Sequence, residues 1–238
     1  MRKVITSNQN TKIKELKKHI NNNKSDFFIV EGYNLVEEAI NKKYCLEIYE
    51  LFGKEKYSDS ILVSDNVLNS VCTTKNPEGI FALCKKENIK NNNFEKIVFL
   101  DNLQDPGNIG TIIRSSVAFE FNAVFSNSNF YNDKIIRSSQ GALFNINLVN
   151  YNNSFLELKK LKEDGYKLYG TTLSSNSIPL NDVNFDSKKI VIIFGNEGNG
   201  IKKEIYDLLD FKVYIPIKFE SLNVSVSAGI VLNKISNG

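Results

Sequence analysis

The sequence has few of the residues that most often build metal centres, disulfide frameworks and imidazole-based active sites. His19 is the only histidine among 238 residues, so a multi-histidine metal site or a histidine base is excluded unless this residue supplies it. We expect His19, in a lysine-rich stretch, to be solvated. Cys45, Cys72 and Cys84 are odd in number and include no C-x-x-C pair, which predicts buried thiols without disulfides or structural zinc. We therefore expect no metal.

Long apolar runs are also missing. No stretch approaches the roughly 20 consecutive apolar residues that a membrane span requires. The first residues, Met1 to Thr6, lead into polar sequence and not into the apolar core of a signal peptide. These absences predict a cytoplasmic protein with no membrane partner.

Negative charge is scarce at the start of the chain. The formal net charge is only +3, but within residues 1–24 seven lysines and arginines face Glu15 alone, a local balance of +6. An anionic polymer would be attracted to such a segment. A plain solvated helix explains the same pattern, and both interpretations stay open.

Arginine is rare compared with lysine: Arg2, Arg114 and Arg137 are the only three. An arginine in such a chain suggests a need for a planar fork that binds phosphate or carboxylate. Arg114 follows Gly110 by four residues on a predicted helix, so the two share a face and the glycine would clear space beside the guanidinium. The alternative is an arginine whose head simply extends to solvent.

Two domains are predicted, with an α/β pattern in each. Residues 85–94 are polar, asparagine-rich and almost free of core residues, as expected for a linker, so we place the domains at residues 1–90 and 91–238. The first would contain helices near 8–22, 33–40 and 66–71, with strands near 27–30, 46–51, 61–63 and 79–83.

Strands and helices alternate through the second domain. This alternation predicts a parallel sheet with helices on both faces. The expected strands are 97–100, 123–125, 147–149, 167–171, 190–194 and 212–215, and the expected helices include 109–119, 155–164 and one from 201 to 209.

The stretch from Ile190 to Gly200 organises the second domain. Five consecutive apolar residues predict a buried strand, and Gly195, Gly198 and Gly200 predict a sharp loop at its carboxyl end, where open α/β sheets bind ligands. Ile201 stands where a phosphate-binding P-loop needs lysine, which excludes that motif. No G-x-G-x-x-G turn follows the first strand, so a Rossmann-type site is not expected either.

Polar residues in three loops complete the candidate site. Glu197, between glycines, would accept hydrogen bonds from backbone or ligand. Asn108 follows an Asp-Pro-Gly turn and is predicted to cap the helix after it. Residues 220–230 alternate like a strand, but Ser221, Ser225 and Gly229 form a helical stripe, which favours a helix capped near Ser221. Asn223 would lie in its first turn, as a ligand-binding or a capping residue.

Three blocks stand in one order: residues 108–114 (Asn-Ile-Gly-Thr-Ile-Ile-Arg), 194–200 (Phe-Gly-Asn-Glu-Gly-Asn-Gly), and 215–225, with Ile-Pro leading to Ser-Leu-Asn-Val-Ser. Together they resemble the three motifs of the SpoU (TrmH) family of RNA ribose 2′-O-methyltransferases, in the SPOUT superfamily. Residues 137–142 look like a further signature, and residues 27–39 and 79–82 resemble the family's RNA-binding domain. The resemblance implies a carboxyl-terminal trefoil knot, an obligate homodimer and bound S-adenosyl-L-methionine.

The same resemblance assigns candidate site residues. The catalytic candidates are Asn108, Arg114, Glu197, Ser221 and Asn223, and the cofactor-binding candidates are Thr171, Gly195, Asn196, Gly200, Ile215, Leu222 and Asn223. The chain departs from the family pattern at Ile217, where methionine is common, and at residues 24–26, where relatives are more basic. The second departure puts RNA contact at residues 24–26 in doubt.

The expected reaction is S-adenosyl-L-methionine-dependent methylation of a ribose 2′-hydroxyl. Arg114 would hold a phosphate and stabilise the developing oxyanion, because a guanidinium is a poor base, and phosphate or water would accept the proton. Ribosomal RNA of the large subunit is favoured over transfer RNA as the substrate. The rival hypotheses are a non-catalytic RNA-binding protein on the same fold and a methyltransferase that acts on a base.

Overall fold

The computed structural model describes residues 2–20, 22, 24–87, 93–174, 176–218 and 220–238. The chain divides into two compact units, Met1–Asn88 and Ile89–Gly238. The predicted boundary at residue 90 lies outside the described residues. Among those described, no helix has the length and apolarity to cross a membrane, and no cluster of metal-binding side chains occurs.

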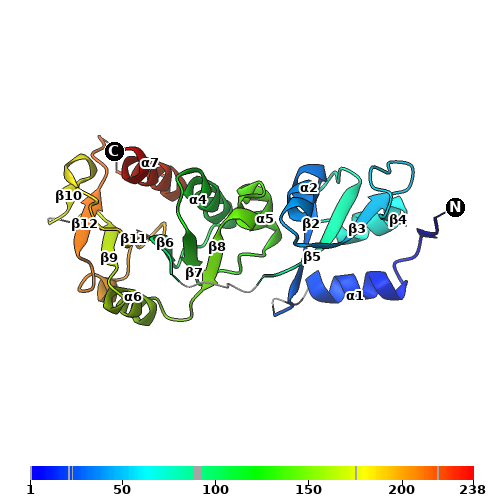
Figure 1. Cartoon of the computed structure of the whole chain (residues 1–238), viewed down its shortest axis with the longest axis horizontal. Helices are drawn as coiled ribbons and strands as arrows, with labels where there is room; N and C mark the ends of the chain where they lie inside the picture. Colours follow the sequence, from blue (N-terminus) through cyan, green and yellow to red (C-terminus); the bar gives the residue numbers. More distant parts are fainter. Residues whose placement is uncertain (1, 21, 23, 88–92, 175, 219) are drawn as a thin grey trace. The chain divides into compact units, whose positions relative to one another are not determined.

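The first unit is a mixed sheet with helices on both faces (Figure 1). The apolar face of the basic helix α1 packs on the sheet together with α3, and α2 lies on the opposite face. Strand pairing is antiparallel at β2–β5 and β3–β5 and parallel at β1–β4 and β3–β4. Its elements are β1 (Val4–Ile5), α1 (Thr11–Ile20), β2 (Phe27–Glu31), α2 (Tyr33–Asn41), β3 (Cys45–Leu51), β4 (Ile61–Val63), α3 (Asp65–Val71) and β5 (Ile80–Lys85).

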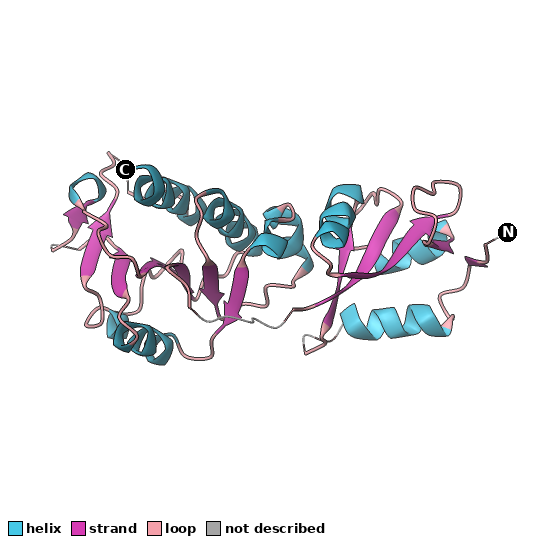
Figure 2. Ribbon diagram, viewed as in Figure 1, coloured by secondary structure: helices cyan, strands magenta, loops and turns pink. Residues whose placement is uncertain are grey.

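The second unit confirms the predicted α/β architecture (Figure 2). Within the described residues its strands follow the order β10-β12-β9-β11-β6-β7-β8, and every adjacent pair is parallel. The strands are β6 (Lys96–Asp101), β7 (Ala123–Ser126), β8 (Asn147–Asn150), β9 (Lys167–Thr171), β10 (Ile178–Pro179), β11 (Ile190–Gly195) and β12 (Phe211–Tyr214).

Helices cover both faces of this sheet, as predicted. Helices α4 and α7 lie on one face and α6 on the other (Figure 1). Residues 190–194 of β11 are all buried, as expected for a strand covered on both sides. The helices are α4 (Pro106–Ala118), α5 (Asp133–Ser139), α6 (Ser154–Glu163) and α7 (Val224–Asn237), with short 3-10 turns η1 (Ala142–Asn145), η2 (Leu180–Asp182) and η3 (Lys203–Ile205).

Two predicted helix starts were wrong. Asp105, and not Asn108, caps α4: its carboxylate accepts a hydrogen bond from the Gly107 amide, and Pro106 occupies the first helical position. Asn223, and not Ser221, caps α7, because its Oδ1 accepts hydrogen bonds from the backbone amides of Ser225 and Val226 in the first turn.

The predicted helix from 201 to 209 is also wrong. This segment forms only the 3-10 turn η3, since Ile201 and Ile205 reach the core without a regular helix. The side chains of Leu209 and Ile201 fill the space beside Gly170 of β9, where an added Cβ would come within 2.5 Å of Leu209.

Several isolated side chains also differ from expectation. His19 is half-buried, and its Nδ1 lies 3.0 Å from the Ser25 hydroxyl. Cys84 is buried, but Cys45 and Cys72 are only half-buried, and burial raises the pKa of the Cys72 thiol to about 12.

Gly110 serves helix packing and not the space beside Arg114. A Cβ at this position would lie 1.9 Å from Ser138 Oγ and 2.8 Å from the Ile135 carbonyl oxygen, both on α5. The glycine therefore lets α4 and α5 approach closely. This packing replaces the explanation predicted from the sequence, in which the glycine clears space beside the guanidinium.

Gly110→Ala should therefore lower the free energy of unfolding by about 1–3 kcal/mol, because α5 must move to admit the methyl group. Urea unfolding measures the change. Ser115→Ala, on the same helix, adds no atoms and should stay within about 0.5 kcal/mol of the parent. Equal stability of the two variants would contradict the close packing.

Candidate functional site at the carboxyl edge of the parallel sheet

The candidate residues gather at the carboxyl edge of the second sheet. Thr171 ends β9, Gly195 ends β11 and Ile215 follows β12, and these three strands are neighbours in the sheet. Because all of them are parallel, their carboxyl ends meet at the same edge. Thr171 is fixed there by a 2.9 Å hydrogen bond from its hydroxyl to the Ile193 carbonyl.

The loop after β11 is tightly closed. The backbones of Asn196 and Gly200 exchange two hydrogen bonds of 3.0 and 2.9 Å, and the Asn196 Oδ1 accepts from the amides of Gly198 and Asn199. A Cβ on Gly195 would lie 2.2 Å from the Gly200 carbonyl carbon, so only glycine permits this closure. Gly200 itself has a φ of 66°. These glycines are required by the loop's own shape.

The closed loop holds Glu197 over the start of α4. Its carboxylate accepts hydrogen bonds from the backbone amides of Gln104 and Asp105, each at 3.3 Å, and from the Asn108 side-chain amide at 3.2 Å. Burial raises the pKa of this carboxyl, but the hydrogen bonds outweigh burial and hold the net pKa below the ordinary glutamate value. Glu197 is therefore a carboxylate at neutral pH.

Asn108 joins this carboxylate to the third motif. It lies in the first turn of α4 with only 8% of its surface exposed. Its Nδ2 donates to Glu197 and its Oδ1 accepts a 3.0 Å hydrogen bond from Asn223 Nδ2. The Asn223 Oδ1 in turn caps α7. Glu197 and Asn223 are 89 and 115 positions from Asn108 in the sequence, and the three residues form one hydrogen-bonded line, Glu197–Asn108–Asn223.

The remaining candidate residues belong to the loops at this edge of the sheet but take no part in the hydrogen-bonded line. Ser221 and Leu222 are exposed in the segment before α7, and no hydrogen bond of the Ser221 hydroxyl occurs within the described residues. The Asn196 side-chain amide donates to the Asn102 carbonyl at 3.0 Å and so ties the glycine loop to the end of β6. A Cβ on Gly200 would meet no atom within 4 Å, and a Cβ on Gly198 would meet only the Asn196 Oδ1, at 3.6 Å.

Arg114 is exposed and takes no part in the hydrogen-bonded line. It follows Asn108 by six residues, which places it about 240° around the helix, on another face. Within the described residues it makes no hydrogen bond or ion pair. The other two arginines are engaged: Arg2 donates to backbone carbonyls of residues 57, 58 and 60, and Arg137 pairs with Asp133 at 2.8 Å. Of the three arginines, only Arg114 has a guanidinium without a partner in the part of the chain that the structure describes.

Three polar groups beside the site were not predicted from the sequence. Asp101, fully buried at the end of β6, accepts from the Lys202 backbone amide at 3.0 Å. Asn102 has a φ of 59° and bonds Asn127 through its side chain. Asp105 pairs with Lys134 at 3.0 Å, and this hydrogen bond lowers the pKa of Asp105. The signal that could have found them is their position at the end of an apolar strand, for Asp101 and Asn102, or in the turn that follows it, for Asp105.

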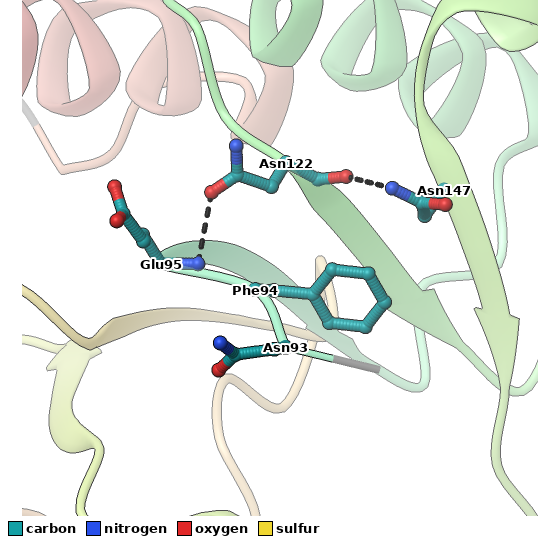
Figure 3. Close-up of a pocket in the computed structure, with 5 residues that line it drawn as sticks. All are labelled: Asn93, Phe94, Glu95, Asn122 and Asn147. Carbon is teal, nitrogen blue, oxygen red and sulfur yellow. Dashed lines mark hydrogen bonds between the residues drawn. The ribbon is translucent and has the colours of Figure 1, made fainter. Parts of the chain in front are cut away.

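A pocket of about 250 Å³ lies at the opposite edge of the sheet (Figure 3). Asn122 lines it with residues that precede or begin β6 and β8. The Asn122 Oδ1 accepts from the backbone amides of Glu95 and Lys96, and its carbonyl accepts from the Asn147 side chain at 2.8 Å. These polar groups connect strand ends to one another, so the pocket is not a second candidate site.

Replacing Asn108 should reveal its coupling to Glu197 through pH. The folded-state pKa of Glu197 is depressed, so its stabilising contribution is present above the unfolded value of about 4.3 and is lost as pH falls through the folded pKa. Asn108→Leu removes one donor and raises that pKa. Urea unfolding should show a loss of about 1 kcal/mol or more at pH 7 and a smaller loss below pH 4.

The control uses Glu197→Gln, which removes the titrating group. In that background the effect of Asn108→Leu should not depend on pH between these two conditions. If Asn108→Leu made in the parent protein lowered the free energy of unfolding by the same amount at both pH values, Asn108 and Glu197 would not be coupled.

A family model and a known protein match this chain over most of its second unit or its whole length. The model of the SpoU rRNA Methylase family matches residues 95–233. The 23S rRNA (guanosine(2553)-2′-O)-methyltransferase RlmP of Bacillus subtilis (strain 168) is 32% identical and aligns over 97% of this chain and 98% of its own length.

Solved structures share the fold of the whole chain. An RNA 2′-O ribose methyltransferase is 25% identical with a TM-score of 0.81, covering 98% of both chains. An AdoMet-bound rRNA methyltransferase from Sinorhizobium meliloti is 23% identical with a TM-score of 0.82, covering 98% of this chain and 97% of that one. With the family model matching more than half of its length, this chain belongs to the SpoU rRNA methylase family.

Proposed function

We propose that this protein transfers a methyl group from S-adenosyl-L-methionine to the 2′-hydroxyl of a ribose in RNA. The observation that carries the proposal is the line Glu197–Asn108–Asn223, in which one residue from each of the three motifs meets at the carboxyl edge of the parallel sheet. Membership of the SpoU family supports the same reaction. A non-catalytic RNA-binding protein would have no need to keep this line.

The residues at this edge fit the proposed cofactor. The carboxyl ends of β9, β11 and β12 present backbone groups near Thr171, Gly195 and Ile215. In the loop after β11, no side chain covers the backbone of Gly198 and Gly200. Leu222, 37% exposed, offers apolar surface next to Asn223. We infer that these groups, with Asn196, hold the adenosine and methionine portions. When bound, the sulfonium supplies the electrophilic methyl group.

We assign the substrate side of the reaction to α4. Arg114 lies on another face of α4 from Asn108, but its free guanidinium, on a long side chain, would bind the phosphate beside the target nucleotide. As the family resemblance implies, it would also stabilise the oxyanion as the ribose hydroxyl loses its proton. The neutral amides of Asn108 and Asn223, oriented by Glu197, would position that hydroxyl. Phosphate or water accepts the proton, because no histidine lies in the second unit.

We propose large-subunit ribosomal RNA as the substrate, at the guanosine equivalent to position 2553 of 23S rRNA. The support is RlmP, whose printed name gives that target and whose length this chain matches almost completely. The first unit would then bind RNA, and the protein would act in the cytoplasm.

We further propose a homodimer and a trefoil knot, which the family resemblance implies. The large apolar side chains of Val226 and Ile230 are 50% and 39% exposed and lie four residues apart on α7. Such a stripe fits a second copy of the chain. For the knot, the support is that α7 leaves the sheet after β12 yet packs against α4, with Asn223 bonded to Asn108.

The proposed chemistry predicts that Arg114→Ala loses methylation activity but keeps its binding of the cofactor. Ribose methylation mapped across total RNA should lose one large-subunit site in a strain lacking the protein, and the variant should fail to restore it. In vitro the rate should fall at least about 100-fold while calorimetric binding of S-adenosylmethionine stays nearly unchanged. Arg114→Lys, which keeps the charge without the fork, should recover little activity.

Other outcomes would overturn the assignment. Lost cofactor binding in Arg114→Ala would refute the role of Arg114. A missing methyl group on transfer RNA or on a base would refute the substrate. An intact methylation map together with no binding of S-adenosylmethionine would favour a non-catalytic RNA-binding protein.

The proposed dimer predicts that a charge in the α7 stripe produces monomers. Val226→Glu should shift the mass measured by analytical ultracentrifugation from two chains to one, because burying an unpaired carboxylate in an apolar contact is costly. Leu156→Glu, on α6 and 62% exposed, is the matched control and should leave the mass unchanged. A monomeric parent protein would contradict the proposal.

A further inference from the structure

A buried carboxylate beside the proposed cofactor site has no task in the proposed reaction. Asp101 is the last residue of β6, and its side chain is 0% exposed. Phe99, two residues earlier on the strand, packs in the hydrophobic core beneath α6, so Asp101 faces the same side of the sheet (Figure 1). In the sheet Asp101 is paired with Gly195, at which β11 passes into the glycine loop of residues 195–200. A charge thus lies buried next to the start of that loop.

The contacts of the Asp101 carboxylate both end on one residue, Lys202. Oδ2 accepts a 3.0 Å hydrogen bond from the Lys202 backbone amide. Oδ1 accepts no hydrogen bond from the residues that the structure describes, and the Lys202 ammonium lies 3.9 Å from it. That ammonium donates to the hydroxyl of Ser154, the first residue of α6, at 3.3 Å. Because Lys202 follows Gly200 by two residues, the carboxylate binds the chain just beyond the exit of the glycine loop.

Stability alone does not account for a charge at this position. Removing a carboxylate from water is costly, and an apolar residue of similar volume often stabilises such a place as well or better. A carboxylate offers what an apolar residue cannot, a directed and charge-assisted hydrogen bond to one particular amide. Here that amide belongs to the segment that leaves the glycine loop.

The glycine loop needs a fixed exit as well as a fixed entry. Its shape depends on the two backbone hydrogen bonds between Asn196 and Gly200, which form only while the flanking chain stays at a set separation. At the entry, Gly195 is paired with β6 in the sheet. At the exit, Asp101 binds the Lys202 amide. The end of β6 therefore fixes both ends of the loop.

We propose that Asp101 is a positioning residue for cofactor binding: through Lys202 it holds the glycine loop in the shape that receives S-adenosylmethionine. This inference rests on the proposed function for the identity of the ligand. Asp101 acts through the backbone of the loop and takes no part in the transfer of the methyl group. It makes the binding shape of the loop the dominant one before the cofactor arrives, so less of the binding free energy is used to order the loop.

The test is cofactor affinity in Asp101→Asn, which keeps the shape of the side chain and removes its charge. Calorimetric titration of the full-length protein with S-adenosylmethionine should show a Kd raised about 10-fold or more, because the apparent Kd rises as the population of the binding-competent loop falls. In methylation assays KM for the cofactor should rise by a similar factor. The kcat at saturating cofactor should stay within about twofold of the parent value, since the binding energy of the cofactor then restores the loop.

Asp210 provides a matched control at the opposite edge of the same sheet. Its mostly buried carboxylate also accepts a hydrogen bond from a backbone amide, that of Leu168 at 2.9 Å, and also pairs with a lysine, Lys162 at 3.3 Å. Asp210→Asn therefore removes a comparable charge near the amino ends of β9 and β12. It should lower the free energy of unfolding in urea, as Asp101→Asn does, but leave the Kd for the cofactor unchanged.

Lys202→Pro breaks the same hydrogen bond from the donor side and decides the question if Asp101→Asn fails to fold. The φ of Lys202 is −59°, which proline adopts, so the change removes the amide donor without forcing a new φ. Its Kd for the cofactor should also rise about 10-fold or more. Adding Asp101→Asn to Lys202→Pro should raise the Kd no further, because both changes remove one interaction.

Hydrogen–deuterium exchange of the cofactor-free protein distinguishes this inference from the proposed function. Peptides that cover residues 195–202 should exchange faster in Asp101→Asn and Lys202→Pro than in the parent and in Asp210→Asn. If the parent bound no S-adenosylmethionine but showed this pattern, the proposed function would fail and the anchoring of the loop would stand. An unchanged Kd in both loop variants, or an equal rise in Asp210→Asn, would overturn the inference. So would a fall in kcat with an unchanged Kd, which would indicate a role in the transfer itself.

Discussion

The candidate site depends on one nearly buried amide, that of Asn108. The nitrogen of a side-chain amide donates hydrogen bonds and its oxygen accepts them. In Asn108 these two atoms bind two different segments of the chain. Its nitrogen satisfies the Glu197 carboxylate and its oxygen satisfies Asn223. A hydrophobic residue in its place would remove one of the three donors to the Glu197 carboxylate and the acceptor of the Asn223 amide. An aspartate would place a second carboxylate against Glu197.

The parallel sheet makes this meeting possible. The first turn of α4, the loop after β11 and the cap of α7 are far apart in sequence but all leave the same edge of one sheet. The glycine loop adds rigidity, because its exchange of backbone hydrogen bonds fixes where Glu197 points. Asn223 has two tasks at once, since the same side chain caps α7 and completes the line to Asn108. Helix position and site geometry are therefore coupled.

Much of the architecture could be predicted from the sequence, because it follows from local periodicity. The buried run at residues 190–194 and the strand–helix alternation were predicted from apolar spacing and are confirmed. The last helix was predicted from its stripe of small residues and is also confirmed, although it begins at Val224. The strands β1 and β10 were not predicted, because two residues are too few to show the alternation of apolar and polar side chains that indicates a strand. The segment after Ile201 was predicted as a helix within the strand–helix alternation, but Ile201 and Ile205 are buried in the core by a segment with only a 3-10 turn.

The site could be predicted only in part. Sequence motifs named Asn108, Glu197 and Asn223, but not the hydrogen bonds that join them, because such pairing is a property of the assembled sheet. The capping errors had a visible remedy: proline at position 106 favours Asp105 as the cap, which frees Asn108 for the site. Gly110 could not be explained without α5, whose Ser138 lies where the Cβ would be.

The most direct test of the account is a crystal structure of the protein with S-adenosylmethionine bound. The account predicts the cofactor at the carboxyl ends of β9, β11 and β12, against backbone near Thr171, Gly195 and Ile215, with its methyl group facing Asn108 and Asn223. A cofactor bound at the opposite edge of the sheet, beside Asn122, or anywhere remote from the Glu197–Asn108–Asn223 line, would contradict it.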